Sequence, residues 1–219
     1  MMIITDSAFD ITEKEAEEMD IRLVWLKTKF SDGDFPMKTE EDFCRFFDKL
    51  AEEKDLPMTS QPSPEEYLEF FEEAKSKEEE VLVLTLSSGL SGTVCGMLDT
   101  LTYLRKGGRI PAALAVVGNM LHIKPVIEQK DKTLTMLGKA RGRSGGMKYL
   151  WKEFESYDID REEPVYFGYT SDREIGEKFM MDTVEKYGLK NYKLYPVGGI
   201  IGTHVGPACV AISFVKKSQ

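Results

Sequence analysis

The sequence predicts two domains, an N-terminal α/β domain with a mainly parallel sheet and a C-terminal α+β domain with a mainly antiparallel sheet. In the first half, helical segments alternate with apolar runs, which is the pattern of strand–helix–strand units. The run VLVLTL at 81–86 is typical of a parallel strand covered on both faces. In the second half, short strand-like runs are separated by turn signals. A length of 219 residues allows two small domains, which we expect at 1–97 and 98–219.

Strand composition and a helix cap mark the first elements. Residues 2–5 are a short apolar run that predicts a strand. Thr12 and Glu15 have the spacing of a capping box, so a helix should begin between them. The segment 21–30 then predicts a single strand, closed by a polar turn that contains a glycine.

Two further helices in the N-terminal half carry strong start signals. Thr39 precedes a segment whose phenylalanines and leucine recur at helical spacing, so one face of this helix should enter a core. Ser63 is a candidate N-cap, with Pro64 at the first helical position and Glu66 completing a capping box. The loop SSGLSGT at 87–93 follows the apolar run and should lead into another helix.

The C-terminal half has a different order of predicted elements, in which hairpins and helices follow one another. The patterns predict, in order, helices at 98–106 and 111–118, a hairpin of 123–128 and 133–139, a helix within 142–156, a strand at 165–170, a helix ending at 187, and strands at 192–197, 200–201 and 210–215. This succession is the basis for an antiparallel sheet with helices beside it.

Composition and charge exclude several classes of function. With 29 basic and 38 acidic residues, the net charge of −9 argues against general nucleic-acid binding. No apolar run is long enough to span a bilayer, and the first residues do not have the pattern of a signal peptide. Cys44, Cys95 and Cys209 form neither a disulfide framework nor a metal-binding pair, so a cytoplasmic location is expected. With only two histidines, no metal site is expected.

The loop SSGLSGT is the strongest local candidate for binding chemistry. It places hydroxyls and glycines where an apolar strand gives way to an expected helix. Free backbone N–H groups at a helix start, together with hydroxyls, suit an anion. Ordinary helix capping accounts for the same residues equally well. Thr59 and Ser60 add two adjacent hydroxyls that capping by Ser63 does not explain.

Cations and a histidine could complete such a site. Arg109 follows two glycines, Arg141 lies in the run KARGR, and His204 lies in what is expected to be a glycine-flanked loop. A charge run is usually a solvated surface, and a lone histidine is more often structural than catalytic. The phosphate-binding motifs GxxxxGK[ST] and GxGxxG are absent. A serine hydrolase that uses Ser91 and His204, with an acid such as Asp6, is the alternative function.

Seven motifs together resemble the DegV family of bacterial fatty-acid-binding proteins. They are IITDSAFDIT, TSQPSPEEY, LTLSSGLSGT, LTYLRKGGRI, LHIKPVI, KARGR and IGTHVGP, in the family's order and across nearly the whole chain. The resemblance implies a two-domain fold with a long-chain fatty acid between the domains. It also implies a carrier that is not an enzyme and uses no cofactor. Such a carrier presents the fatty-acid carboxylate to a separate fatty-acid kinase, which makes acyl phosphate for phospholipid synthesis.

The resemblance also assigns the carboxylate-binding residues. Thr59 and Ser91 match the family's carboxylate contacts, and His204 matches the histidine near the carboxylate. The family also uses an arginine, for which two positions fit. The candidate residues are therefore Thr59, Ser60, Ser91, Gly92, His204, Arg109 and Arg141. Thr59, Ser91 and His204 should converge in one pocket with otherwise apolar walls.

The sequence departs from the family pattern in two places. Ala208 stands where the family usually has a glycine, just after the HVGP motif. The chain also passes directly from LSGTVCGM to LDTLTYL, where the family has a further strand and helices. A sheet without that strand should expose an edge, so we expect self-association or a partly open acyl tunnel. Carrier, serine hydrolase, and a remnant that folds without binding are the three functions to be distinguished.

Overall fold

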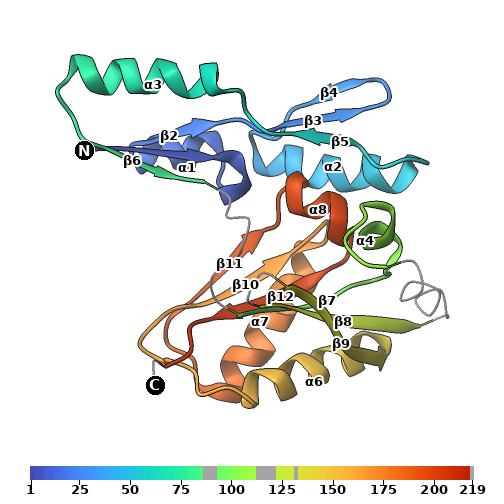
Figure 1. Ribbon diagram of the computed structural model, residues 1–219. Helices are drawn as coiled ribbons and strands as arrows, with labels where there is room; N and C mark the ends of the chain where they lie inside the picture. The colour runs from blue at the N-terminus through green and yellow to red at the C-terminus, as the bar shows by residue number, and fades with distance from the viewer. Residues whose placement is uncertain (86–92, 112–121, 131–132, 218–219) are drawn as a thin grey trace.

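The structure is a computed structural model that describes residues 1–85, 93–111, 122–130 and 133–217 (Figure 1). Its strands are β1 (Met2–Asp6), β2 (Ile21–Val24), β3 (Lys27–Phe30), β4 (Gly33–Phe35), β5 (Met58–Ser60), β6 (Val81–Leu84), β7 (Thr93–Met97), β8 (Ile123–Lys130), β9 (Thr133–Arg141), β10 (Val165–Tyr169), β11 (Tyr192–Pro196) and β12 (Val210–Phe214). Its helices are η1 (Ser7–Phe9), α1 (Glu13–Glu18), α2 (Glu40–Glu52), α3 (Pro64–Ser76), α4 (Thr102–Lys106), α6 (Gly142–Glu155), α7 (Arg173–Tyr187) and α8 (Gly199–Val205).

A three-stranded parallel sheet forms the centre of the N-terminal part. Strand β1 lies between β2 and β6, and both of these run parallel to it. Helix α3 packs on this sheet through Ala74, which joins Met2, Ile4 and Val24 in a small buried cluster. The capping boxes predicted at α1 and α3 are present, and the helix expected after Thr39, α2, begins with one as well. The parallel sheet predicted for this part is therefore confirmed.

The single strand expected at 21–30 is wrong, because the chain changes sheet in the middle of it. Strand β2 pairs with β1, whereas β3 pairs antiparallel with β4 and β5 in a separate three-stranded sheet. The break is fixed by Ser7, whose hydroxyl accepts a hydrogen bond of 2.9 Å from the backbone N–H of Leu26. The second sheet packs on α2 through Phe30 and Phe46.

A six-stranded sheet in the order β11-β10-β12-β7-β8-β9 forms the C-terminal part. All of its pairs are antiparallel except the parallel pair β10–β11, which confirms the mainly antiparallel sheet. Helices α6 and α7 cover one face, as Figure 1 shows below the sheet. Phe167, Phe179 and Ile212 are almost fully buried between the sheet and these helices.

The helix expected after SSGLSGT is wrong for its described part, because Thr93–Met97 is strand β7. This strand is hydrogen-bonded to β12 and β8, inside the C-terminal sheet. The described residues that follow it, up to residue 111, contain the short helix α4. The change from one sheet to the other therefore falls between Leu84 and Thr93, upstream of the boundary expected near residue 97. The helix expected at 111–118 lies, from residue 112 on, outside the described residues.

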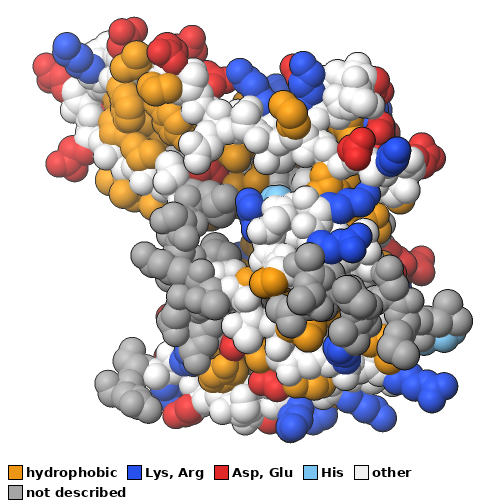
Figure 2. Space-filling view, turned by 45° about the vertical axis from the view of Figure 1, so that its right-hand side comes forward, with side chains coloured by type: hydrophobic (Ala, Val, Ile, Leu, Met, Phe, Trp, Pro, Cys, Tyr) orange, Lys and Arg blue, Asp and Glu red, His pale blue; other side chains and the backbone are white. Residues whose placement is uncertain are grey.

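Strand β6 lies at the edge of its sheet and is not covered on both faces as predicted. Among the described strands it pairs only with β1. Leu82, Val83 and Leu84 are exposed by 41%, 38% and 45%. Because successive side chains of a strand point to opposite faces, apolar surface is open on both sides of this edge. Figure 2 shows hydrophobic side chains gathered over this N-terminal region.

Helix α8 and the segment around α4 join the two parts of the molecule. Helix α8 packs against both α2 and α4 (Figure 1). Tyr103 of α4 adds to the phenylalanine cluster of α2. Arg173 of α7 forms an ion pair of 2.8 Å with Glu40 of α2. Within the described residues, no helix has the length and apolar character that a bilayer crossing requires.

Candidate functional site

Helix α8 carries the motif IGTHVGP and lies at the junction of the two parts. A Cβ atom at Gly199 would lie 3.2 Å from the Phe46 ring, and one at Gly202 would lie 2.6 Å from the Phe47 ring. Only glycine at Gly202 therefore allows α8 to approach α2 this closely. Because α8 approaches α2 closely, the histidine of this motif lies near the N-terminal part of the molecule.

His204 lies in the last turn of α8, not in the glycine-flanked loop expected from the sequence. Its ring packs on Gly107, at a place where any Cβ would overlap the imidazole. Burial, reinforced by the nearby charge of Arg109, lowers the pKa of His204 below its ordinary value. The imidazole is therefore neutral at pH 7, with one N–H to donate. Of the two candidate arginines, Arg109 is the one that lies beside His204.

Arg109 is exposed and follows α4, where its side chain donates a hydrogen bond of 3.2 Å to the backbone carbonyl of Gly107. Arg141 is the last residue of β9 and precedes α6, and its side chain makes no hydrogen bond or ion pair among the described residues. Ser91 and Gly92 lie outside the described residues, so their predicted place at the site stays a prediction.

Thr59 and Ser60 lie on β5 and are exposed, as a residue that meets a ligand must be. The capping box predicted just after them is present, and in it the backbone N–H of Ser63 donates a hydrogen bond of 2.6 Å to the Glu66 carboxylate. The register places Thr59 directly opposite Thr28 of β3. In an antiparallel pair, opposite residues share one face of the sheet, so the two threonines are neighbours.

Three buried polar atoms of the described residues have no hydrogen-bond partner in the structure. They are Asp10 Oδ1, Thr28 Oγ1 and His204 Nδ1. Asp10 contacts Gly198 at the start of α8, His204 lies near its end, and Thr28 faces the same side as Thr59. Buried polar groups are normally paired, so these three atoms are exceptions within the described residues.

Asp10 is a residue that the sequence analysis missed. Burial raises its pKa to about 7, a nearby negative charge on Asp6 adds to this, and the backbone N–H of Gly198 opposes it. Its backbone has φ of 57°, a left-handed conformation that Asp tolerates better than most residues. The signal that could have revealed it is the second aspartate of the motif IITDSAFDIT. A second missed residue is Thr28, for which the sequence gives only the alternation of strand β3.

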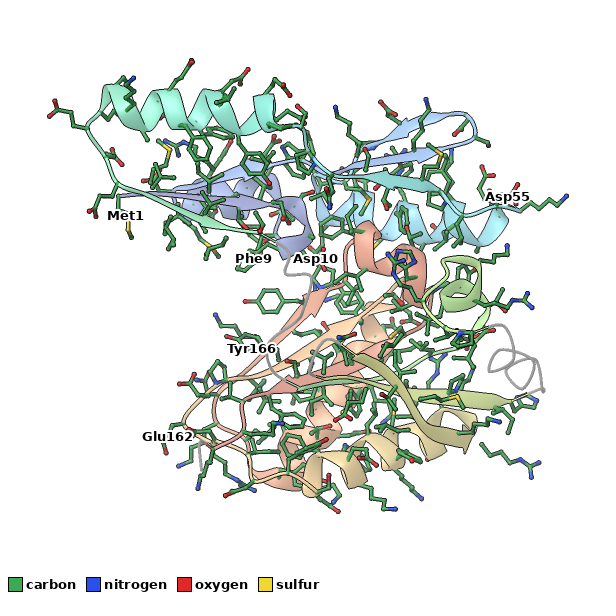
Figure 3. All side chains as sticks on the ribbon, viewed as in Figure 1. Met1, Phe9, Asp10, Asp55, Glu162 and Tyr166 are labelled. Carbon is green, nitrogen blue, oxygen red and sulfur yellow. The ribbon has the colours of Figure 1, made fainter. Side chains whose placement is uncertain are left out.

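The TDS residues of the same motif serve the fold. The Thr5 hydroxyl donates a hydrogen bond of 2.8 Å to the Leu84 carbonyl, and Asp6 accepts one of 3.0 Å from the N–H of Ala8. Thr5 thus links the end of β1 to β6, and Asp6 is the N-cap of η1. Phe9, at the end of η1, is 55% exposed on the side that faces Tyr166 of the C-terminal sheet (Figure 3).

The arrangement offers hydrogen-bond donors for an anion, and only the acid side of a serine hydrolase can be compared with it, because Ser91 lies outside the described residues. In such a hydrolase, a carboxylate accepts the proton of the histidine Nδ1 and orients the ring. Nδ1 of His204 has no such partner among the described residues. Ala208, near the end of the same motif, adopts a left-handed φ of 56°, which explains why a glycine suits this position.

The chain belongs to the DegV family. The family model described as "Uncharacterised protein, DegV family" matches residues 1–96 and 94–217. A relative from Thermotoga maritima named as a fatty acid-binding protein is 26% identical over 275 aligned positions, which cover 95% of each chain.

Solved structures share the fold. One, from Thermotoga maritima and described as revealing a fatty acid binding function, has a TM-score of 0.81 at 20% identity, with 99% of both chains covered. Another is the fatty acid kinase B3 protein of Streptococcus pneumoniae loaded with linoleic acid. Its TM-score is 0.76 at 15% identity, with 99% of this chain and 100% of that chain covered. The two-part α/β architecture is thus that of known DegV proteins.

An internal segment of the family is missing from this chain, as predicted. The 275 positions aligned with the Thermotoga maritima relative exceed the 219 residues of the chain, so at least 56 positions have no counterpart here. The two matches to the family model meet at residues 94–96, inside β7. The missing segment therefore belongs close to β7, the first described strand after β6.

Proposed function

We propose that this protein is a carrier that binds a long-chain fatty acid between its N-terminal and C-terminal domains. Its carboxylate is held by Thr59, Ser60, Ser91, Gly92 and His204, together with an arginine. The observation that carries the proposal is that His204 packs on Gly107 and that Arg109 donates a hydrogen bond to the carbonyl of the same glycine, where α8 meets α4. A neutral imidazole and a guanidinium are both donors, and a carboxylate accepts from both.

The acyl chain has a suitable surface on the face of the C-terminal sheet that α6 and α7 leave uncovered. There the register aligns Gly168, Ala211 and Gly96 across three neighbouring strands, and Tyr166 lies on the same face. Small side chains leave room for a chain of CH₂ groups, each of which contributes about 0.8 kcal/mol when it is buried. Exposed Phe9 faces this surface from the N-terminal side (Figure 3).

A separate fatty-acid kinase is the proposed partner that receives the carboxylate. The name of the Streptococcus pneumoniae neighbour, a fatty acid kinase B3 protein loaded with linoleic acid, supports this partner for the present chain. The protein itself then supplies binding and orientation, and the phosphoryl transfer belongs to the kinase. We also propose that the open β6 edge leads to self-association.

The first test is to denature the purified protein and identify the released lipids by mass spectrometry. We expect a long-chain fatty acid and no turnover of a chromogenic ester. Ester turnover that is lost in Ser91→Ala would instead establish the hydrolase. Release of no lipid, together with failure to bind added fatty acid, would make the chain a remnant without binding function.

The second test separates the two arginines. Arg109→Ala should weaken fatty-acid binding about 5- to 100-fold, the range for one charge-assisted hydrogen bond. Arg105→Ala is the matched control, because Arg105 is an exposed arginine in the last turn of the neighbouring helix α4. An effect of Arg141→Ala with none of Arg109→Ala would move the carboxylate toward the start of α6.

A further inference from the structure

The side chain of Thr28 is a buried hydroxyl that the fold does not require. Thr28 is only 1% exposed, and its Oγ1 has no partner among the described residues. A β-branched residue suits a strand, but valine has the same shape and would avoid the cost of burying an unpaired hydroxyl. The hydroxyl of Thr28 is therefore retained at a cost that packing does not explain.

The neighbour of this hydroxyl is Thr59, which is a proposed ligand-binding residue. The two residues are register partners in the β3–β5 pair, and side chains directly opposite one another have Cβ atoms about 4.5–5.5 Å apart. Thr59 is exposed, whereas Thr28 is enclosed. One hydroxyl thus faces the open side of the site and the other lies behind it.

We propose that Thr28 is a positioning residue of the carboxylate site and acts through Thr59. With the fatty acid bound, the Thr28 hydroxyl donates to Thr59 Oγ1, and the Thr59 hydroxyl donates its own proton to the carboxylate. The chain of two bonds fixes the rotamer of Thr59, and each bond polarises the next. This inference rests on the proposed function, because the carboxylate is the group that orders the chain.

A buried threonine elsewhere in the molecule shows the opposite situation and serves as a control. Thr183 of α7 is fully buried, and its hydroxyl donates a bond of 2.6 Å to the Phe179 carbonyl and accepts one of 2.8 Å from Trp151. Its hydroxyl is satisfied, and it lies between α7 and α6, on the helix-covered side of the C-terminal sheet. The variant Thr183→Val should therefore lower the urea midpoint and leave fatty-acid affinity unchanged.

The test measures oleate affinity and urea midpoint for Thr28→Val, Thr28→Ser and Thr59→Val, singly and as the double variant Thr28→Val/Thr59→Val. We expect Thr28→Val to weaken binding about 3- to 10-fold, as for the loss of one hydrogen bond, with an unchanged or raised urea midpoint. Thr28→Ser should bind within about twofold of the native chain, because the hydroxyl is kept. In the Thr59→Val background, Thr28→Val should cause no further loss, because its route to the carboxylate is already gone.

Three results would overturn the inference. Unchanged affinity in Thr28→Val would mean that the hydroxyl has no part in binding. Equal losses in the presence and absence of the Thr59 hydroxyl would mean that Thr28 does not act through Thr59. A native chain that binds no fatty acid would overturn the proposed function as well, whereas the first two results would leave it standing.

Discussion

The two principal sheets of this protein differ in how fully they are enclosed. The C-terminal sheet has six strands and a continuous buried cluster of thirteen described residues beneath α6 and α7. The N-terminal parallel sheet has three described strands and a buried cluster of only four residues. Its edge strand β6 leaves three apolar side chains exposed. A parallel sheet ordinarily has both faces covered, so the N-terminal sheet is the incomplete one.

The difference follows from where the family's missing segment would lie. The two matches to the family model meet at 94–96, inside β7, which is the next described strand after the open edge strand β6. The positions without a counterpart therefore fall where the chain passes from β6 of the N-terminal sheet to β7 of the C-terminal sheet. A segment at this place would be the nearest cover for the open edge of β6, and the six strands of the C-terminal sheet pair continuously without it.

The largest effect is expected from a matched pair of core substitutions, one in each sheet. Ile212 lies on the central strand β12 and is 1% exposed, and Ile4 lies on the central strand β1 and is fully buried. Ile212→Ala should lower the free energy of unfolding by about 3–5 kcal/mol, and Ile4→Ala by about 2–3 kcal/mol. The cost of a cavity falls where the surroundings can collapse, and the small N-terminal cluster can collapse more easily.

Urea denaturation followed by circular dichroism measures both values. A loss for Ile4→Ala that equals or exceeds the loss for Ile212→Ala would show that the N-terminal cluster is as rigid as the C-terminal one. The comparison between the sheets would then rest on exposure alone.

A smaller effect is expected at Asp10, where the N-terminal part meets the start of α8. The pKa of Asp10 is raised to about 7, so the folded protein holds a proton that the unfolded chain has already lost. The contribution of Asp10 to the free energy of unfolding is therefore largest below about pH 4, the pKa of an aspartate in the unfolded chain. This contribution is lost as the pH rises through the folded-state pKa of about 7. Asp10→Asn keeps the shape and removes the charge, so it should stabilise the protein by about 1–3 kcal/mol at pH 8 and little at pH 5.

Urea midpoints at the two pH values test this prediction. Asp20→Asn is the control, because Asp20 also has a left-handed backbone, with φ of 53°, but is exposed. A gain at pH 5 as large as that at pH 8 would mean that the amide adds a new contact and that burial of the charge is not the cause.

The sequence predicts much of this fold because its signals are local. Capping boxes such as Thr12 with Glu15 mark helix starts by chemistry within one turn, and these helices are where the spacing predicts them. The split of 21–30 into two strands depends on the hydroxyl of Ser7, which contacts Leu26 from a distant part of the sequence. The strand β7 was mistaken for a helix because its neighbours, β12 and β8, follow only later in the chain.

For the candidate site, the resemblance of motifs predicts which residues take part. Which of them lie close together depends on the fold and could not be predicted. His204 and Arg109 are separated by most of the C-terminal part, and only the packing of α8 on the segment after α4 brings them together. Thr28 and Asp10 could not be predicted, because an unsatisfied buried atom is a property of the folded surroundings and not of the residue type.

The smallest effect on stability, and the sharpest test of the open edge, is expected at β6. Leu84 is 45% exposed, so Leu84→Lys should change the free energy of unfolding by less than about 0.5 kcal/mol. A lysine on an edge strand opposes pairing with another chain, so this variant should be more monomeric than the native protein in concentration-dependent light scattering. Leu68→Lys is the control, because Leu68 is 50% exposed but lies on helix α3 and not on an edge strand. Equal shifts in both variants would indicate a general effect of charge. A native chain that is monomeric and also binds a long-chain fatty acid tightly would show that β6 needs no second chain to cover it.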